Sequence, residues 1–171
     1  MNRVMLDLET MGTASDSAII AIGAVRFNTE GIVDRFYEIV DLQSCIDAGL
    51  RVDGSTVVWW MQQADQAREE FTKKGTHINS ALQNFSEWIG DDAEVWGNGA
   101  NFDNAILSSA YRICCHVLPW KFWNDRCYRT VKALHPKVKL SRVGTYHCAV
   151  DDAESQALHL ISIFKAAGES L

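Results

Sequence analysis

The chain has 171 residues, of which 47% are apolar and 22% are charged, so it is long enough for one domain with a substantial core. Its formal net charge of −6 argues against a protein that holds nucleic acid on a broad basic surface. No apolar stretch reaches the roughly 18 residues of a membrane span, and the five cysteines form no C-x-x-C pair, which indicates a cytoplasmic protein with reduced thiols rather than a disulfide framework or a zinc site.

The order of predicted elements indicates the fold class. Apolar and β-branched residues predict strands over residues 3–8, 18–27 and 33–40, with Gly31 in a turn, and a short buried strand over 93–97. Helical patterns cover residues 42–48, 54–72, 77–89, 103–114, 125–134 and 150–167, with Asn124 or Asp125 expected to cap the helix over 125–134. Strands first, then helices interleaved with short strands, predict an α/β fold in one domain over residues 1–171, with a mixed sheet covered by helices. The pattern does not fix the strand order.

Asp7 and Glu9 lie two positions apart in the first predicted strand. Side chains at that spacing share one face, so the two carboxylates lie roughly 7 Å apart along the strand. Leu6 and Leu8 then face the other side and can enter the core. The alternative is an edge strand that carries two solvated acids.

Three further candidate residues, Asp103, His147 and Asp152, lie near the starts of predicted helices, where sites can form. Asp103 comes just after the strand over 93–97, where ligands bind α/β sheets, although Asn101 or Asp103 also suits a helix cap. His147 and Asp152 lead into the last helix, where the helix dipole favours an acid by about 0.3–1 kcal/mol. Capping therefore accounts for Asp151 and Asp152 without catalysis.

Convergence of Asp7, Glu9, Asp103 and Asp152 would need a counter-charge. Unpaired carboxylates about 4 Å apart repel by around 4 kcal/mol per pair at an effective dielectric near 20. Mg²⁺ and Mn²⁺ prefer carboxylate oxygens, and two such ions could activate a water and stabilise the leaving oxygen of a phosphodiester. A histidine, with an ordinary pKa near 6.5, could take the proton from that water.

Three motifs occur in a recognisable order, as Asp7-Leu-Glu9-Thr10, Asn98-x-x-x-Phe102-Asp103 and His147-x-x-x-x-Asp152. The set resembles the DEDDh family of 3′–5′ exonucleases, within the ribonuclease H-like superfamily, and spans residues 7 to 152. It is similar to phage exodeoxyribonucleases and to bacterial exoribonucleases of the RNase AS type. Family spacing alone selects Asp152 over Asp151.

The resemblance implies a ribonuclease H-like mixed five-stranded sheet flanked by helices, and two Mg²⁺ or Mn²⁺ ions held by the four carboxylates. By analogy, Asp7 ligates both ions, Glu9 and Asp152 the first, and Asp103 the second, largely through water, while His147 is the general base. The implied reaction removes 5′-mononucleotides from the 3′ end of single-stranded DNA or RNA. The resemblance also places Thr10 and Met11 against the terminal nucleotide, adds Asn98 and Phe102 to the substrate-binding residues, and suggests a homodimer.

Trp59 and Trp60 are adjacent in the helix predicted over 54–72, so their side chains point about 100° apart. One can face the site and stack on a base, which contributes about 1–3 kcal/mol without sequence preference. Alternatively, both belong to the core. Two other functions also suit the chain as a whole: an inactive exonuclease-like interaction module, and a metal-dependent phosphoester hydrolase on the same scaffold.

Overall fold

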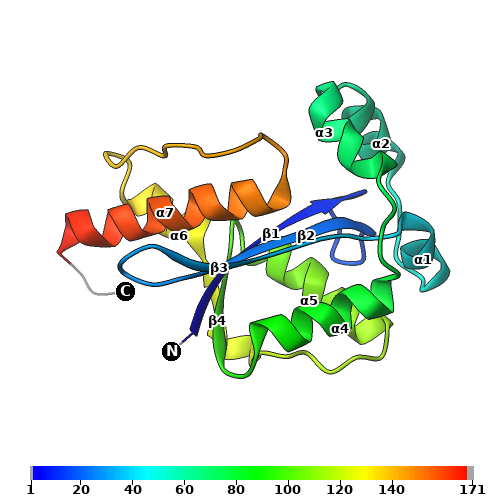
Figure 1. Ribbon diagram of the computed structural model, residues 1–171, viewed down its shortest axis with the longest axis horizontal. Helices are drawn as coiled ribbons and strands as arrows, with labels where there is room; N and C mark the ends of the chain where they lie inside the picture. Colours follow the sequence, from blue (N-terminus) through cyan, green and yellow to red (C-terminus); the bar gives the residue numbers. More distant parts are fainter. Residues whose placement is uncertain (1, 169–171) are drawn as a thin grey trace.

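A computed structural model describes residues 2–168, except for the side chain of Glu70, and contains a five-stranded mixed sheet with helices on both faces (Figure 1). The strand order is β3-β2-β1-β4-β5. The strands are β1 (Asn2–Thr10), β2 (Ile19–Phe27), β3 (Ile32–Ile39), β4 (Ala93–Gly97) and β5 (Asp125–Cys127). β1, β2 and β3 pair antiparallel, whereas β4 runs parallel to β1 and β5 runs parallel to β4. The predicted fold class is confirmed.

Seven α-helices and two 3₁₀ turns accompany the sheet in the described part of the chain. The helices are α1 (Leu42–Asp47), α2 (Gly54–Met61), α3 (Asp65–Glu69), α4 (Ile78–Ile89), α5 (Asp103–Ile113), α6 (Tyr128–Leu134) and α7 (Ala149–Ala167). The 3₁₀ turns are η1 (Glu70–Thr72) and η2 (Phe122–Asn124). None of these helices has the length and hydropathy needed to span a bilayer. The five cysteines form no disulfide within the described residues.

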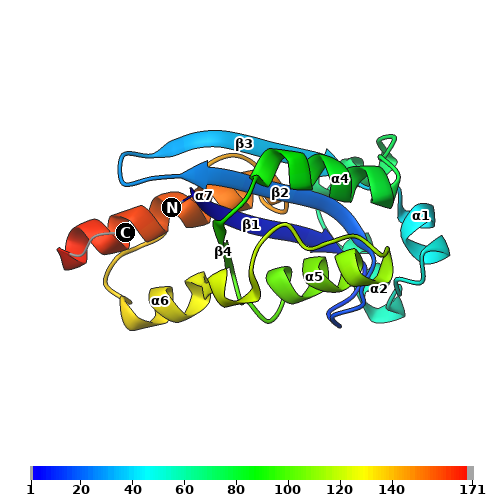
Figure 2. The same cartoon turned by 90° about the horizontal axis from the view of Figure 1, so that it is seen from below.

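Side chains of β1 contribute to two separate apolar cores, one on each face of the sheet, because successive side chains of a strand point to opposite faces. Leu6 and Leu8 pack with α4 and α5 on one face, in a cluster that includes Leu82, Phe85 and Ile106. On the other face, α6 and α7 pack against the sheet, as Figure 2 shows from a second direction. The helix predicted over 150–167 is confirmed as α7, and one face of it is apolar, with these residues in or against the second cluster: Val150, Ala153, Ala157, Leu160, Ile161 and Phe164.

The prediction of one continuous helix over 54–72 was wrong, because the chain forms three shorter elements there, α2, α3 and η1. The break lets Phe71 fold back onto Trp60, with ring centroids 4.5 Å apart. In one straight helix those residues would be separated by about 16 Å along the axis, at 1.5 Å per residue. The gain in apolar packing therefore outweighs the local helical preference.

The helix predicted over 125–134 begins only at Tyr128, because residues 125–127 form the edge strand β5. Asp125 is consequently not a helix cap. Its Oδ1 accepts hydrogen bonds from Trp120 Nε1 (2.9 Å) and Asn104 Nδ2 (2.8 Å). A strand of three residues is too short to show an alternating pattern, which explains the wrong assignment.

Candidate active site

The carboxylates of Asp7 and Glu9 lie near the end of the central strand. β1 is flanked by β2 and β4, so the edge-strand alternative is wrong. Leu6 and Leu8 are buried on the opposite face, which leaves both acids on the side of α7. Gln156 of α7 donates a hydrogen bond to Asp7 Oδ1 (2.7 Å), and Glu9 is only 9% exposed.

Asp103 begins α5 but does not cap it. The N-cap residue is Phe102, which makes no side-chain capping bond. Instead, Asp103 Oδ1 accepts the backbone N–H of Leu8 (3.1 Å), and Oδ2 accepts that of Asn98 (3.0 Å). These bonds tie the carboxylate, 2% exposed, to the end of β1. Gly97 permits the approach, since a Cβ there would stand 2.3 Å from the side chain of Asn104.

The last helix brings the third motif to the sheet. An added Cβ on Gly23 of β2 would lie 2.1 Å from the backbone carbon of Ala149, so only glycine allows the start of α7 to come this close. Asp152, 7% exposed, is thereby placed beside Glu9. Asp151 has a different surrounding, because its Oδ2 accepts the backbone N–H of Thr145 (2.7 Å) in the loop before the helix.

Glu9, His147 and Asp152 form a cluster of possible metal ligands in the described part of the chain. One ligand atom from each lies within 4.8 Å of the others. His147 has a left-handed backbone with φ of 62°, and its ring meets that of Trp59 edge to face at 5.3 Å between centroids. Among the described residues, Arg142 is the cation that pairs with a carboxylate of this group, through Asp152.

Burial and mutual repulsion disfavour ionisation of the acids. Burial raises the pKa of Asp7 well above its ordinary value, and the charges of Asp103, Glu9 and Asp152 raise it further. Burial likewise raises the pKa of Glu9 to about 9, with Asp152 and then Asp103 adding to the effect. Asp103 has a pKa raised to about 7 by burial, against the lowering by its backbone hydrogen bonds. Asp7 and Glu9 therefore need nearby positive charge to ionise at neutral pH.

Burial acts on His147 in the opposite sense, because its charged form is the protonated one. It lowers the pKa of the imidazole below the ordinary value near 6.5, while Asp152 raises it and Arg142 lowers it. The net direction is downward, so the neutral ring prevails at pH 7. A neutral imidazole can accept a proton.

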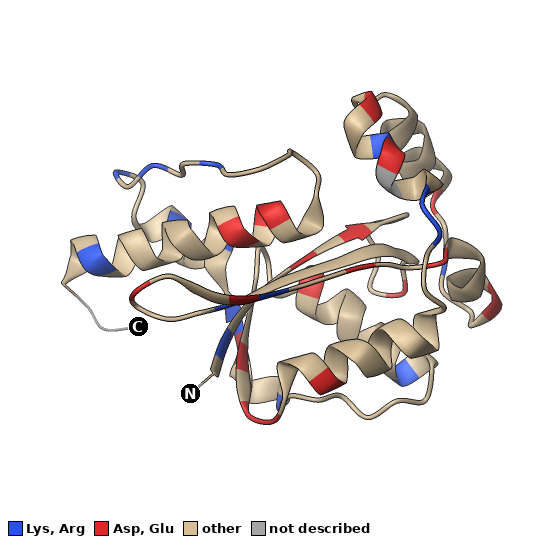
Figure 3. Cartoon of the chain, viewed as in Figure 1, with Lys and Arg blue, Asp and Glu red and all other residues tan. Residues whose placement is uncertain are grey.

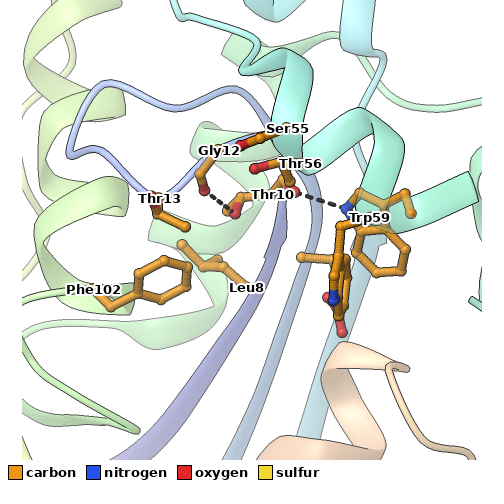
Figure 4. Close-up of a pocket in the computed structure, with 10 residues that line it drawn as sticks. Leu8, Thr10, Gly12, Thr13, Ser55, Thr56, Trp59 and Phe102 are labelled. Atoms are coloured by element: carbon orange, nitrogen blue, oxygen red, sulfur yellow. Dashed lines mark hydrogen bonds between the residues drawn. The ribbon is translucent and has the colours of Figure 1, made fainter. Parts of the chain in front are cut away.

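A pocket of about 450 Å³ opens beside Glu9, and we call it the terminal pocket (Figure 4). Trp60 is 4% exposed and donates from Nε1 to the carbonyl of Thr10 (2.9 Å), whereas Trp59 is 42% exposed. The terminal pocket is lined by Leu8, Glu9, Thr10, Gly12, Thr13, Ser55, Thr56, Trp59, Trp60 and Phe102. Both tryptophans border the pocket, but Trp59 presents the accessible ring and Trp60 anchors α2 to the end of β1.

The other residues expected to bind substrate lie at different places. Met11 is 8% exposed and belongs to the main apolar cluster, and its backbone holds Asp53 through a hydrogen bond from Asp53 N to Met11 O (2.7 Å). Gly12 and Thr13 are the residues after Thr10 that border the terminal pocket. Asn98 holds Asp103 through its N–H, while its carbonyl accepts a bond from Arg129.

Sequence reasoning missed two side chains that contact the acids, Gln156 and Arg142. Gln156 lies one helical turn after Asp152, and a polar residue on the apolar face of the last helix was a signal that could have revealed it. Arg142 lies in the irregular segment between α6 and α7, where no periodicity indicates the direction of a side chain.

Comparison with known proteins shows the family of this chain. A family model described as the 3′-5′ exoribonuclease Rv2179c-like domain matches residues 2–164. The exodeoxyribonuclease of Enterobacteria phage T4 is 26% identical over 157 residues, covering 74% of this chain and 68% of the relative. The PolC-type DNA polymerase III of Bacillus subtilis is 26% identical over 179 residues, covering 97% of this chain but 12% of the polymerase.

Solved structures show the same fold at low sequence identity. The nuclease domain of 3′hExo, a DEDDh family member bound to rAMP, has a TM-score of 0.66 at 14% identity, covering 99% of this chain and 94% of that one. Exonuclease X in complex with 5′ overhanging duplex DNA has a TM-score of 0.64 at 17% identity, with coverages of 98% and 94%. Fold and relatives together define a 3′–5′ exonuclease of the DEDDh type. Within that class, the chain belongs to the Rv2179c-like 3′-5′ exoribonuclease domain family.

Proposed function

We propose that this protein is a metal-dependent exonuclease that hydrolyses the last phosphodiester of single-stranded nucleic acid and releases 5′-mononucleotides. The observation that carries the proposal is the gathering of four carboxylates, from β1, α5 and α7, beside a histidine and a pocket of nucleotide size. Within the described part of the chain, Asp152 is the only one of these four acids that forms an ion pair with a basic side chain.

The donor set fits divalent metal ions. Carboxylate oxygens are the ligands that Mg²⁺ and Mn²⁺ prefer, and the raised pKa values of Asp7 and Glu9 indicate a site that binds positive charge strongly. We assign the two ions to Asp7, Glu9, Asp103 and Asp152. When bound, such a pair supplies an activated water and stabilises the leaving oxygen of the phosphodiester.

Residues of the chain itself position the 3′ nucleotide and accept the proton of the attacking water. His147, neutral at pH 7 through its lowered pKa, accepts a proton from the attacking water. The terminal pocket receives the 3′ nucleotide, with the accessible ring of Trp59 available for stacking. Asp152, rather than Asp151, is the assigned ligand, because Asp151 is engaged with the backbone of Thr145.

RNA and DNA are both candidate substrates. The family description names an exoribonuclease, whereas the phage relative is an exodeoxyribonuclease. The pocket lining offers hydroxyls that could accept or donate to a ribose 2′-OH, from Thr10, Thr13, Ser55 and Thr56. This favours RNA as the better substrate.

The experiment incubates matched single-stranded RNA and DNA oligonucleotides, labelled at the 5′ end, with the protein and Mn²⁺. We expect stepwise shortening from the 3′ end, release of 5′-mononucleotides, and no reaction with EDTA. Asp152→Asn should abolish the reaction, and the neighbouring Asp151→Asn should retain most of it. Intact strands would refute the proposal, and release of inorganic phosphate would indicate a phosphatase instead.

A further inference from the structure

The charge of this acidic chain is strongly segregated. Residues 126–150 contain six lysines and arginines and no aspartate or glutamate, whereas the rest of the chain carries 10 basic residues against 22 acidic ones. Figure 3 shows basic positions along the segment that crosses above α7. The net charge of −6 therefore conceals a locally basic surface.

Three of these basic residues, Arg129, Lys132 and Lys139, border a groove of about 580 Å³, which we call the basic groove. One wall is α6, with Arg129 and Lys132, and the other is the segment after α6, with Lys139. The same two walls carry the apolar residues Ala133, Val138 and Leu140, and none of the described residues that border the groove is acidic. Cationic and apolar groups side by side suit a strand in which phosphates link sugars that carry bases.

Both walls begin at the candidate active site. Arg129 donates to the carbonyl of Asn98, the residue whose N–H holds Asp103, and its charge lowers the pKa of Asp103 against the larger effect of burial. From the other wall, Arg142 pairs with Asp152. The carboxylates thus lie between the terminal pocket, bordered by Glu9, and the basic groove, bordered by Asn98.

The carboxylates do not account for the lysines farther along the groove. Lys132 Nζ lies over the ring of Tyr128 at 5.9 Å, and Lys139 Nζ donates to the carbonyl of Pro136 (3.1 Å). Within residues 2–168, neither lysine has an ion-pair contact with a carboxylate. Exposed cations without acidic partners are available to an anionic ligand.

We propose that the basic groove binds the sugar–phosphate backbone of the substrate strand on the 5′ side of the scissile bond. This inference rests on the proposed exonuclease function. A strand whose last nucleotide occupies the terminal pocket would pass its scissile phosphate over the carboxylates and continue between Arg129 and Arg142 to Lys132 and Lys139. Recognition is by phosphate charge, so it does not depend on base sequence.

The test compares an octanucleotide with a dinucleotide of the same terminal sequence, because a dinucleotide is too short to reach the two lysines. The double variant Lys132→Ala/Lys139→Ala should raise KM for the octanucleotide and leave kcat and KM for the dinucleotide unchanged. Each lost phosphate contact removes about 0.7 from the slope of log affinity against log salt, and two contacts remove about 1.4. When salt rises from 50 to 200 mM, the affinity of the variant for the octanucleotide should therefore fall roughly sevenfold less than that of the wild type.

Two comparison variants separate groove binding from general effects. Lys132→Arg/Lys139→Arg keeps the charge and should restore octanucleotide KM. Lys74→Ala/Lys121→Ala removes equal charge outside the groove and should leave KM and salt slope as in the wild type. The proposal that the groove binds the strand would be overturned by unchanged octanucleotide kinetics in the Lys132→Ala/Lys139→Ala protein. An equal effect of Lys74→Ala/Lys121→Ala would overturn it as well. A wild-type protein inactive on both substrates would instead refute the exonuclease function.

Discussion

Replacement of Glu9 by Gln tests the electrostatics of the site, because it keeps the shape of the side chain and removes one buried acid. Burial and the neighbouring carboxylates raise the pKa of Glu9 from its ordinary value of 4.5 to about 9. At a pH between these two pKa values, Glu9 keeps its proton in the folded, metal-free protein but has lost it in the unfolded chain. Its free energy of unfolding must then fall as pH rises through this window.

Repulsion between the charges gives a lower bound on the magnitude, because burial is the larger cause of the raised pKa and adds to the effect. Ligand atoms of Glu9 and Asp152 lie within 4.8 Å of each other. Two unit charges at that distance repel by about 3.5 kcal/mol at an effective dielectric near 20. For a chain of this size, about 3.5 kcal/mol corresponds to a change in Tm of roughly 7–14 °C.

Thermal unfolding in EDTA at pH 5.5 and pH 9 measures the effect. The wild type should lose stability between the two values, and Glu9→Gln should lose less by at least about 3.5 kcal/mol. Some loss should remain in the variant, because Asp103 has a pKa raised to about 7. Glu30→Gln, at an exposed turn, is the matched control and should behave as the wild type. Parallel losses in the wild type and Glu9→Gln would show that Glu9 is not held against repulsion.

Three further predictions concern His147, Gly23 and Trp59. His147→Ala should slow hydrolysis by about 10²–10⁴, and the wild-type rate should rise with pH through a value below 6.5, because the neutral ring is the base and burial lowers its pKa; an unchanged rate would exclude that role. Gly23→Ala should cost about 3 kcal/mol or more in urea unfolding, since its Cβ would lie 2.1 Å from the backbone of Ala149, whereas Gly54→Ala, with no atom within 4 Å, should be neutral or gain up to about 1 kcal/mol. Trp59→Ala should raise KM by roughly 5- to 150-fold through loss of about 1–3 kcal/mol of stacking, and an unchanged KM would show that the ring does not touch the substrate.

The parts of the fold that could be predicted are those with a repeated local pattern. Leu6 and Leu8 alternate with Asp7 and Glu9, and this period of two both identified the strand and divided its faces. The last helix was equally legible, because its apolar residues recur at helical spacing and pack as one face. In both cases a local preference and the tertiary packing demand the same conformation.

The parts that could not be predicted depend on contacts between distant segments. Asp125 lies in an edge strand because β4 offers free backbone groups beside it, and the three residues of β5 carry no pattern of their own. The division of the helix over 54–72 likewise follows from packing of Phe71 on Trp60. Neither contact is visible in the order of residues along the chain.

Net charge was informative about the broad surface of this protein but not about its groove. A deep site with four acids must be negative to attract metal ions, whereas the path of the substrate must be positive to hold phosphates. Arg129 and Arg142 lie where these requirements meet, one bonded to Asn98 and the other paired with Asp152. The lysines farther along the groove form no ion pair with these acids among the described residues, so they can act on phosphates while the acids stay available to metal ions. Opposite charges can therefore serve one reaction in a chain whose total is acidic.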